Sequence, residues 1–209
     1  MSYRTERDPD PKLAFSDTEL RDLAVAWLTL SAAFALLFEP IHRGGNVALF
    51  VEMVVLSFIT VGMGFLLHEV AHKVVAIEFG QTAEFRADYQ MLFLAIMGAL
   101  VGFLFAAPGA VYHRGQITER ENGLIALAGP VTNLLLALLF LPLMILPGIL
   151  GVIGQMGIWI NLFLAAFNMI PFGPLDGKSV LKWHKGVFAL VFVPSALLAG
   201  FVVFYVGLF

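Results

Sequence analysis

Residues 54–72 read VVLSFITVGMGFLLHEVAH, an uncharged run of fourteen residues that leads directly into two histidines and a glutamate. Residues i and i+4 of an α-helix lie on one face, so His68 and His72 can reach the same ion. Glu69 lies beside that ion and can take a proton from water. Charged side chains within a membrane helix cost about 2.5–3.5 kcal/mol each on insertion scales, so packing alone does not explain this cluster.

The apolar character of this stretch extends over the whole chain of 209 residues, which is 60% hydrophobic and 13% charged. Soluble domains average about 45–50% apolar and about 25% charged residues, so we expect a lipid bilayer to cover most of the exterior. The net charge of −3 and the lack of a basic tract exclude nucleic acid as a partner. Cysteine is absent, so any metal must be held by histidines and carboxylates.

Apolar length predicts five membrane-spanning helices, because about 20 apolar residues cross a bilayer. The segments of sufficient length are 20–41, 47–79, 125–146, 149–170 and 187–209. Ser16 resembles a helix N-cap, and Glu19 completes a capping-box pattern with it. We therefore predict an all-α polytopic membrane protein, in which a polar cytoplasmic arm (1–19) precedes one membrane domain (20–209, core about 47–182).

A sixth apolar run, residues 91–107, contains Gly98 and Gly102 and precedes Pro108-Gly109. With five crossings, ten lysines and arginines fall on the side of the N-terminus and Arg43 alone on the other, which is a strong positive-inside distribution. A further crossing would move Arg114 and Arg120 to the opposite side. We therefore expect 91–107 to form a re-entrant or hairpin element packed on protein or lining a wet cavity.

Two histidines are too few for a zinc site, so a third protein ligand is needed. The candidates near apolar segments are Glu39, Glu52, Glu84, Asp88, His113, Asp176 and His184. Asp176 follows Pro171, Gly173 and Pro174, which break the preceding helix and let a carboxylate turn inward. If 91–107 is re-entrant, Asp176 emerges on the same side of the membrane as the histidines.

Glu84 is the alternative third ligand. Residues 84–88, EFRAD, resemble the third-ligand signature of the membrane gluzincins that process CAAX proteins. In that family the glutamate belongs to a separate helix, whereas Glu84 follows His72 by only twelve positions, with Gly80 between them. The chain has little room to return on a second helix, so a polar interfacial loop is the competing interpretation of Glu84.

Three motifs in one order carry a more extensive resemblance: HEVAH at 68–72, AGPVTN at 128–133 and NMIPFGPLDG at 168–177. With them, the chain resembles the site-2 protease family of intramembrane zinc metalloproteases. The resemblance implies one Zn²⁺ per chain bound by His68, His72 and Asp176, with Glu69 as general base and Asn168 as an oxyanion donor. It also implies three core spans and a short β element near residues 107–112, against which an unwound substrate pairs.

The sequence therefore predicts a zinc-dependent endopeptidase of a plasma membrane, which cleaves membrane-spanning proteins and has its active site toward the cytoplasm. Two other classes are a metal transporter, whose ligands would be spread along a path, and a catalytically silent relative, which would lack one of the four motif residues. Asn133 is expected to bond a neighbouring helix, with a place in the active site as the alternative. His113 is expected at the cytoplasmic surface.

Overall fold

The computed structural model describes residues 12–103 and 107–206. Five helices in this part of the chain are long and apolar enough to cross a membrane, which confirms the predicted fold class. They are α1 (Asp17–Phe38), α2 (Val47–Glu78), α4 (Glu119–Met144), α5 (Ile149–Asn168) and α7 (Lys185–Val206). The shorter elements are a 3-10 turn η1 (Ile41–Arg43), β1 (Thr82–Ala87), α3 (Tyr89–Val101), β2 (Gly109–Arg114) and α6 (Asp176–Trp183).

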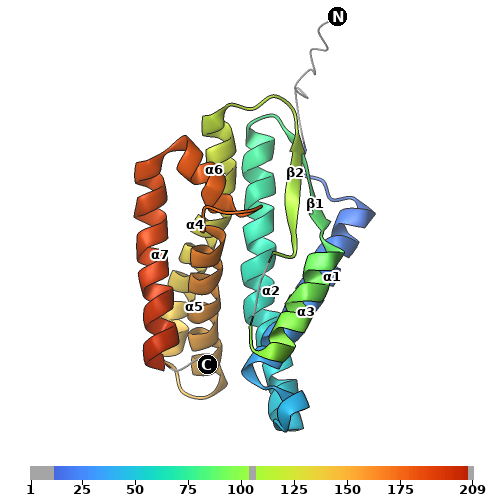
Figure 1. Ribbon diagram of the computed structural model, residues 1–209, viewed down its shortest axis with the longest axis vertical. Helices are drawn as coiled ribbons and strands as arrows, with labels where there is room; N and C mark the ends of the chain where they lie inside the picture. The colour runs from blue at the N-terminus through green and yellow to red at the C-terminus, as the bar shows by residue number, and fades with distance from the viewer. Residues whose placement is uncertain (1–11, 104–106, 207–209) are drawn as a thin grey trace, which may run out of the picture.

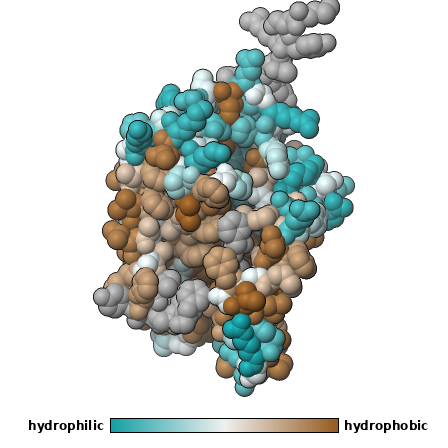
Figure 2. Space-filling model, viewed as in Figure 1, coloured by the Kyte–Doolittle hydropathy of each residue, from teal (hydrophilic) through white to brown (hydrophobic). Residues whose placement is uncertain are grey.

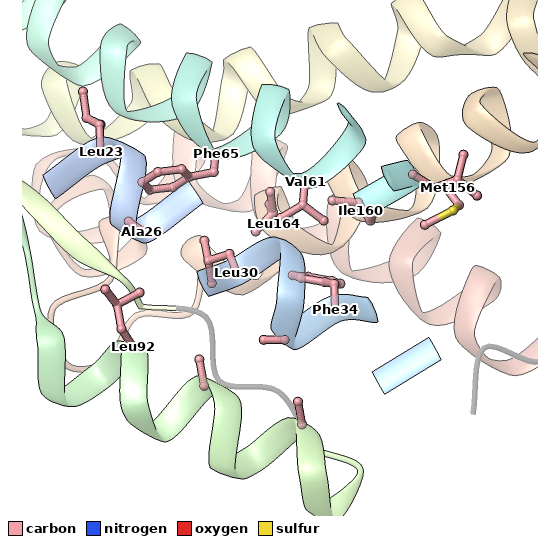
Figure 3. Packing of buried hydrophobic residues seen from close by; sticks show 14 of the residues in the cluster. Leu23, Ala26, Leu30, Phe34, Val61, Phe65, Leu92, Met156, Ile160 and Leu164 are labelled. Atoms are coloured by element: carbon pink, nitrogen blue, oxygen red, sulfur yellow. The ribbon is translucent and has the colours of Figure 1, made fainter. Parts of the chain in front are cut away.

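The long helix α2 runs through the middle of the molecule, with α4, α5 and α7 on one side and α1, α3 and the strands on the other (Figure 1). The main apolar core lies where α1, α2 and α5 meet. In Figure 3, Leu30 and Phe34 of α1 point toward Val61 of α2 and toward Ile160 and Leu164 of α5. These three helices therefore share one core, to which α3 contributes Leu92.

The surface in Figure 2 carries a broad hydrophobic band below a hydrophilic cap at the end where the N-terminal segment lies. A smaller hydrophilic patch lies at the opposite end, near the start of α2. Large apolar side chains such as Leu190, Leu197 and Phe204 of α7 are exposed. A band of this kind between two polar ends is the surface that a bilayer covers.

Residues 80–116 leave the C-terminal end of α2 and return to it. β1 and β2 are antiparallel, with Thr82 opposite Arg114 and Ala87 opposite Gly109, and α3 lies in the connection between them. The far end of α3 reaches the turn after α1, where the Arg43 guanidinium donates to the Leu100 carbonyl at 2.9 Å. The apolar run predicted at 91–107 is thus re-entrant; its residues 104–106 lie outside the described part of the chain.

Several element boundaries differ from the prediction because polar residues also begin helices. α1 starts after the predicted Ser16 N-cap, but the Glu19 carboxylate does not complete a capping box; it accepts from Lys73 and Phe85 instead. A complete capping box lies at Thr118, so α4 begins six residues before the predicted 125. The helix α6 was not predicted. Residues 1–11 of the predicted N-terminal arm and residues 207–209 of the last predicted span lie outside the described residues.

Candidate metal centre and active site

Three potential ligand atoms converge between the C-terminal half of α2 and the start of α6. The Nε2 atoms of His68 and His72 lie 3.0 Å apart, and Asp176 Oδ2 lies 3.3 Å from each of them. Both imidazoles are buried, and among the described residues these three form the group able to hold a metal ion. The structure therefore brings together the three ligands predicted from the sequence.

In the neutral form of each imidazole, the hydrogen bond on its far side leaves Nε2 without a proton. His72 Nδ1 donates to the Ile125 carbonyl at 2.7 Å, and His68 Nδ1 donates to Asn133 Oδ1 at 2.6 Å. Each ring then presents a lone pair to the carboxylate Asp176 Oδ2, which is buried and has no donor among the described residues. Three lone pairs at these distances repel one another unless a cation lies between them, and zinc prefers such nitrogen and oxygen ligands.

Glycine at position 129 of α4 makes room for this site. A Cβ added there would lie 2.5 Å from the Nε2 atoms of both His68 and His72. Any larger residue would occupy the space on which the imidazoles converge. The AGPVTN motif thus contributes Gly129 as the wall of the site and Asn133 as the partner of His68.

Asp176 reaches the histidines because α5 ends and the chain turns sharply. Gly173 has a φ of 62°, a conformation that favours glycine. Leu175 is the N-cap of α6, and Asp176 is the first residue of that helix. In the metal-free protein, burial raises the pKa of the Asp176 carboxyl, but the protonated imidazoles of His72 and His68 outweigh this effect and lower the pKa to about 2. The carboxylate is therefore ionised at neutral pH, as a metal ligand must be.

A cavity of about 170 Å³ opens onto the three ligands. Glu69, which is 7% exposed, and Asn168 line it from the helices, and β2 lines it through residues including Gly109 and Val111. The cavity thus contains a metal-binding group, a carboxylate beside it and the edge of a strand. These are the parts required for hydrolysis of a polypeptide.

Glu84, the alternative third ligand, lies outside the group of converging ligands. Glu84 lies on β1 opposite Tyr112, where Ser16 donates to its carboxylate and Arg86 pairs with it at 2.7 Å. The Ser16 hydroxyl and the Arg86 guanidinium lower the pKa of this partly exposed carboxyl. Glu84 is therefore absent from the ligand group of the described residues, and the gluzincin-like alternative is wrong for this geometry.

Asn168 lies at the end of α5 and donates through Nδ2 to the Leu164 carbonyl at 3.0 Å. Because its side chain also lines the cavity, its role as an oxyanion donor stays a prediction. His113 is not simply a surface residue, since it lines the same cavity and burial lowers the pKa of its imidazole. The sequence analysis did not predict the roles of the Ile125 carbonyl as partner of His72 or of Gly129 as the wall of the site. The one indication of a polar network here was the position of Asn133 at membrane depth.

Two known proteins are similar to this chain. A protein of Methanocaldococcus jannaschii named "Putative zinc metalloprotease MJ0611" is 43% identical over 185 residues, which cover 86% of this chain and 92% of that protein. "Putative zinc metalloprotease YwhC" of Bacillus subtilis is 33% identical over 145 residues, covering 59% of this chain and 66% of that protein. No family model and no solved structure matches the chain.

The first of these similarities extends over most of the length of both proteins, which is sufficient to assign the family. A metal transporter would spread its ligands along a path, whereas the described ligands here meet at one point. With its five helices of membrane-spanning length, this chain belongs to a family of zinc metalloproteases.

Proposed function

We propose that the chain is an intramembrane endopeptidase that hydrolyses peptide bonds of membrane-spanning proteins, with one zinc ion per chain. The observation that supports this most strongly is the buried meeting point of His68, His72 and Asp176 beside Glu69, inside a bundle of apolar helices. Catalytic zinc sites have three protein ligands and an open position that faces a cavity, whereas structural zinc sites have four protein ligands.

His68, His72 and Asp176 would hold the zinc, and Glu69 would move the protons. Zinc held by these three ligands would supply a water of pKa about 7 and a Lewis acid for the carbonyl that is attacked. The Glu69 carboxylate takes a proton from the attacking water on one of its oxygens and returns it to the leaving nitrogen. Asn168 has a second N–H besides the one bonded to Leu164, and we assign it to the carbonyl oxygen as negative charge develops there.

The sheet suggests how a substrate is held, because only one of its edges faces the cavity. The Phe85 amide on β1 donates to Glu19 Oε1 at 3.0 Å, and the Ala87 amide donates to Asp22 Oδ2 at 3.3 Å. Both amides thus point away from β2, so Phe85–Val111 and Ala87–Gly109 are non-hydrogen-bonded pairs.

In such a pair the second residue also points its N–H and C=O away from its partner strand. The Val111 and Gly109 backbone groups are therefore directed toward the free edge of β2, on the side that lines the cavity. A helical substrate exposes no backbone groups until it unwinds. We propose that the unwound segment adds to this edge as a strand, which presents its peptide bonds to the site.

The distribution of charge supports a plasma-membrane protein whose site faces the cytoplasm. The strands, the start of α4 and α6 carry basic residues at the end of the molecule nearer the site, and Arg43 lies at the opposite end beside Leu100. Basic residues concentrate on the cytoplasmic side of membrane proteins. The site then opens toward cytoplasmic water, which the hydrolysis consumes.

The test uses the purified protein reconstituted in vesicles with single-span peptides that carry a fluorophore and a quencher. Wild type should cleave them with about one zinc per chain, Asp176→Ala should lose both zinc and cleavage, and Glu69→Gln should keep zinc but lose cleavage. Glu84→Gln, at a partly exposed residue outside the ligand group, should keep both. Cleavage by Glu69→Gln at the wild-type rate would refute the assigned mechanism.

A further inference from the structure

Two buried asparagines from different helices connect His68 to the backbone of the bundle. Asn133 of α4 and Asn161 of α5 are both 0% exposed. The Asn133 amide donates from Nδ2 to the Gly64 carbonyl at 3.1 Å and to Asn161 Oδ1 at 2.9 Å. Asn161 Nδ2 donates in turn to the Gly157 carbonyl at 2.8 Å. Every polar atom of these two side chains thus has a partner.

The orientation of both amides follows from backbone carbonyls, which can only accept hydrogen bonds. The Gly157 carbonyl requires the NH₂ group of Asn161, so Asn161 Oδ1 faces Asn133. The Gly64 carbonyl and that oxygen both require the NH₂ group of Asn133. Asn133 Oδ1 therefore faces His68, and the His68 ring must carry its proton on Nδ1.

We propose that Asn133 and Asn161 form a positioning relay that holds the His68 ring with Nε2 free of a proton, and that this relay sets the zinc affinity of the site. The proposal rests on the metal site assigned above, and neither asparagine is a ligand. Groups that orient a ligating imidazole typically change metal affinity by 10–100-fold when removed.

The two histidines are held by different means. His72 donates to the Ile125 carbonyl, a backbone group that no side-chain substitution removes. The orientation of His68 depends on two side chains, Asn133 of α4 and Asn161 of α5. Asn161 can approach α2 closely because Gly64 of α2 has no side chain; a Cβ at position 64 would lie 2.9 Å from Asn161 Oδ1. The packing of α5 against α2 therefore affects the hydrogen bonding of His68 but not that of His72.

The experiment measures zinc affinity of the intact protein in detergent, by competition with a chromogenic chelator after the metal has been stripped. Asn133→Leu should lower the affinity 10–100-fold, because the leucine has a similar size but no acceptor for His68. Asn133→Asp restores an acceptor and should recover part of the loss. Asn161→Leu should cause a smaller loss, since Asn133 keeps its bond to Gly64.

A relay also predicts non-additivity, so the double variant Asn133→Leu/Asn161→Leu should bind zinc no more weakly than Asn133→Leu alone. Thr60→Val is the matched control: Thr60 lies on α2, is fully buried and donates to the Leu56 carbonyl, without a connection to His68. The visible absorption of the Co²⁺-loaded protein should change in Asn133→Leu and stay as in wild type in Thr60→Val.

Wild-type zinc affinity in Asn133→Leu, additive losses in the double variant, or an equal loss in Thr60→Val would each overturn the relay. Asp176→Ala is measured alongside. If wild type and Asp176→Ala bind zinc equally, the metal site itself has been assigned wrongly. If only Asp176→Ala loses zinc and Asn133→Leu does not, the metal site stands and the relay fails.

Discussion

Lys73 Nζ lies 2.5 Å from Glu19 Oε2, and both side chains are almost completely buried. The ammonium also donates to the Ala14 carbonyl at 2.6 Å and lies 4.2 Å from the centre of the Phe15 ring. The other oxygen of Glu19 accepts from the Phe85 amide. One carboxylate therefore joins α1 to β1 and to α2, at the residue that follows His72, a proposed metal ligand.

Glu19→Leu should destabilise the protein by about 3–5 kcal/mol, because it leaves the Lys73 ammonium buried without its counter-ion. The double variant Glu19→Leu/Lys73→Met should recover most of this loss, since both charges are then gone. Thermal unfolding in detergent, with tryptophan fluorescence as the signal, measures the difference. Glu119 and Lys182 form an exposed pair, and Glu119→Ala should change the unfolding temperature little. Equal effects of the two substitutions would contradict the importance of burial.

Gly129→Ala should greatly reduce zinc binding while the protein remains folded, because the added methyl group would lie 2.5 Å from the Nε2 atoms of both proposed histidine ligands. Zinc content by elemental analysis of the purified protein checks this expectation. Gly200→Ala in α7 is the matched control, since a Cβ there meets no atom within 4 Å. One zinc per chain in Gly129→Ala would show that α4 does not limit the space of the site.

Val111→Pro should abolish cleavage of membrane-spanning peptides and leave zinc content unchanged. Proline removes the N–H that points to the free edge of β2 and spares the hydrogen bonds between β2 and β1. Val111→Ala shortens the side chain but keeps the N–H, so it should retain most of the activity. Ala110→Pro should disrupt the hairpin itself, because Ala110 pairs with Arg86 in the hydrogen-bonded register. Full activity in Val111→Pro would exclude strand addition at this edge.

On the acid side of neutrality, the metal-free protein should lose a stabilising contribution of Asp176 only in strong acid. The pKa of this carboxyl is lowered from 3.8 to about 2, so the folded state favours its ionised form. While the neighbouring imidazoles are protonated, the contribution is fully present above about pH 4, and it is lost as the pH falls through about 2. The difference in thermal stability between wild type and Asp176→Asn, both stripped of metal, should be constant between about pH 4 and 6 and shrink below pH 4. A difference that already shrinks between pH 6 and 5 would contradict the lowered pKa.

The sequence by itself determined the features that depend on local periodicity and on length. His68 and His72 share a face because the helix repeats every 3.6 residues, and the five spans follow from apolar length against the thickness of a bilayer. The return of residues 91–107 was also predictable, because the placement of charge and of Asp176 permitted one topology. These inferences need no knowledge of which side chains meet.

Only the tertiary structure decided the contacts between distant parts of the chain. Asn133 bonds to His68 across 65 positions and Lys73 to Glu19 across 54, and no periodic pattern marks either pair. Their partners depend on how α4 and α1 pack against α2, where a buried polar group must find whichever complementary group the packing places beside it. The spans and the ligand helix therefore follow from the sequence, and the tertiary structure supplies the partners that orient the ligands and hold the strands in place.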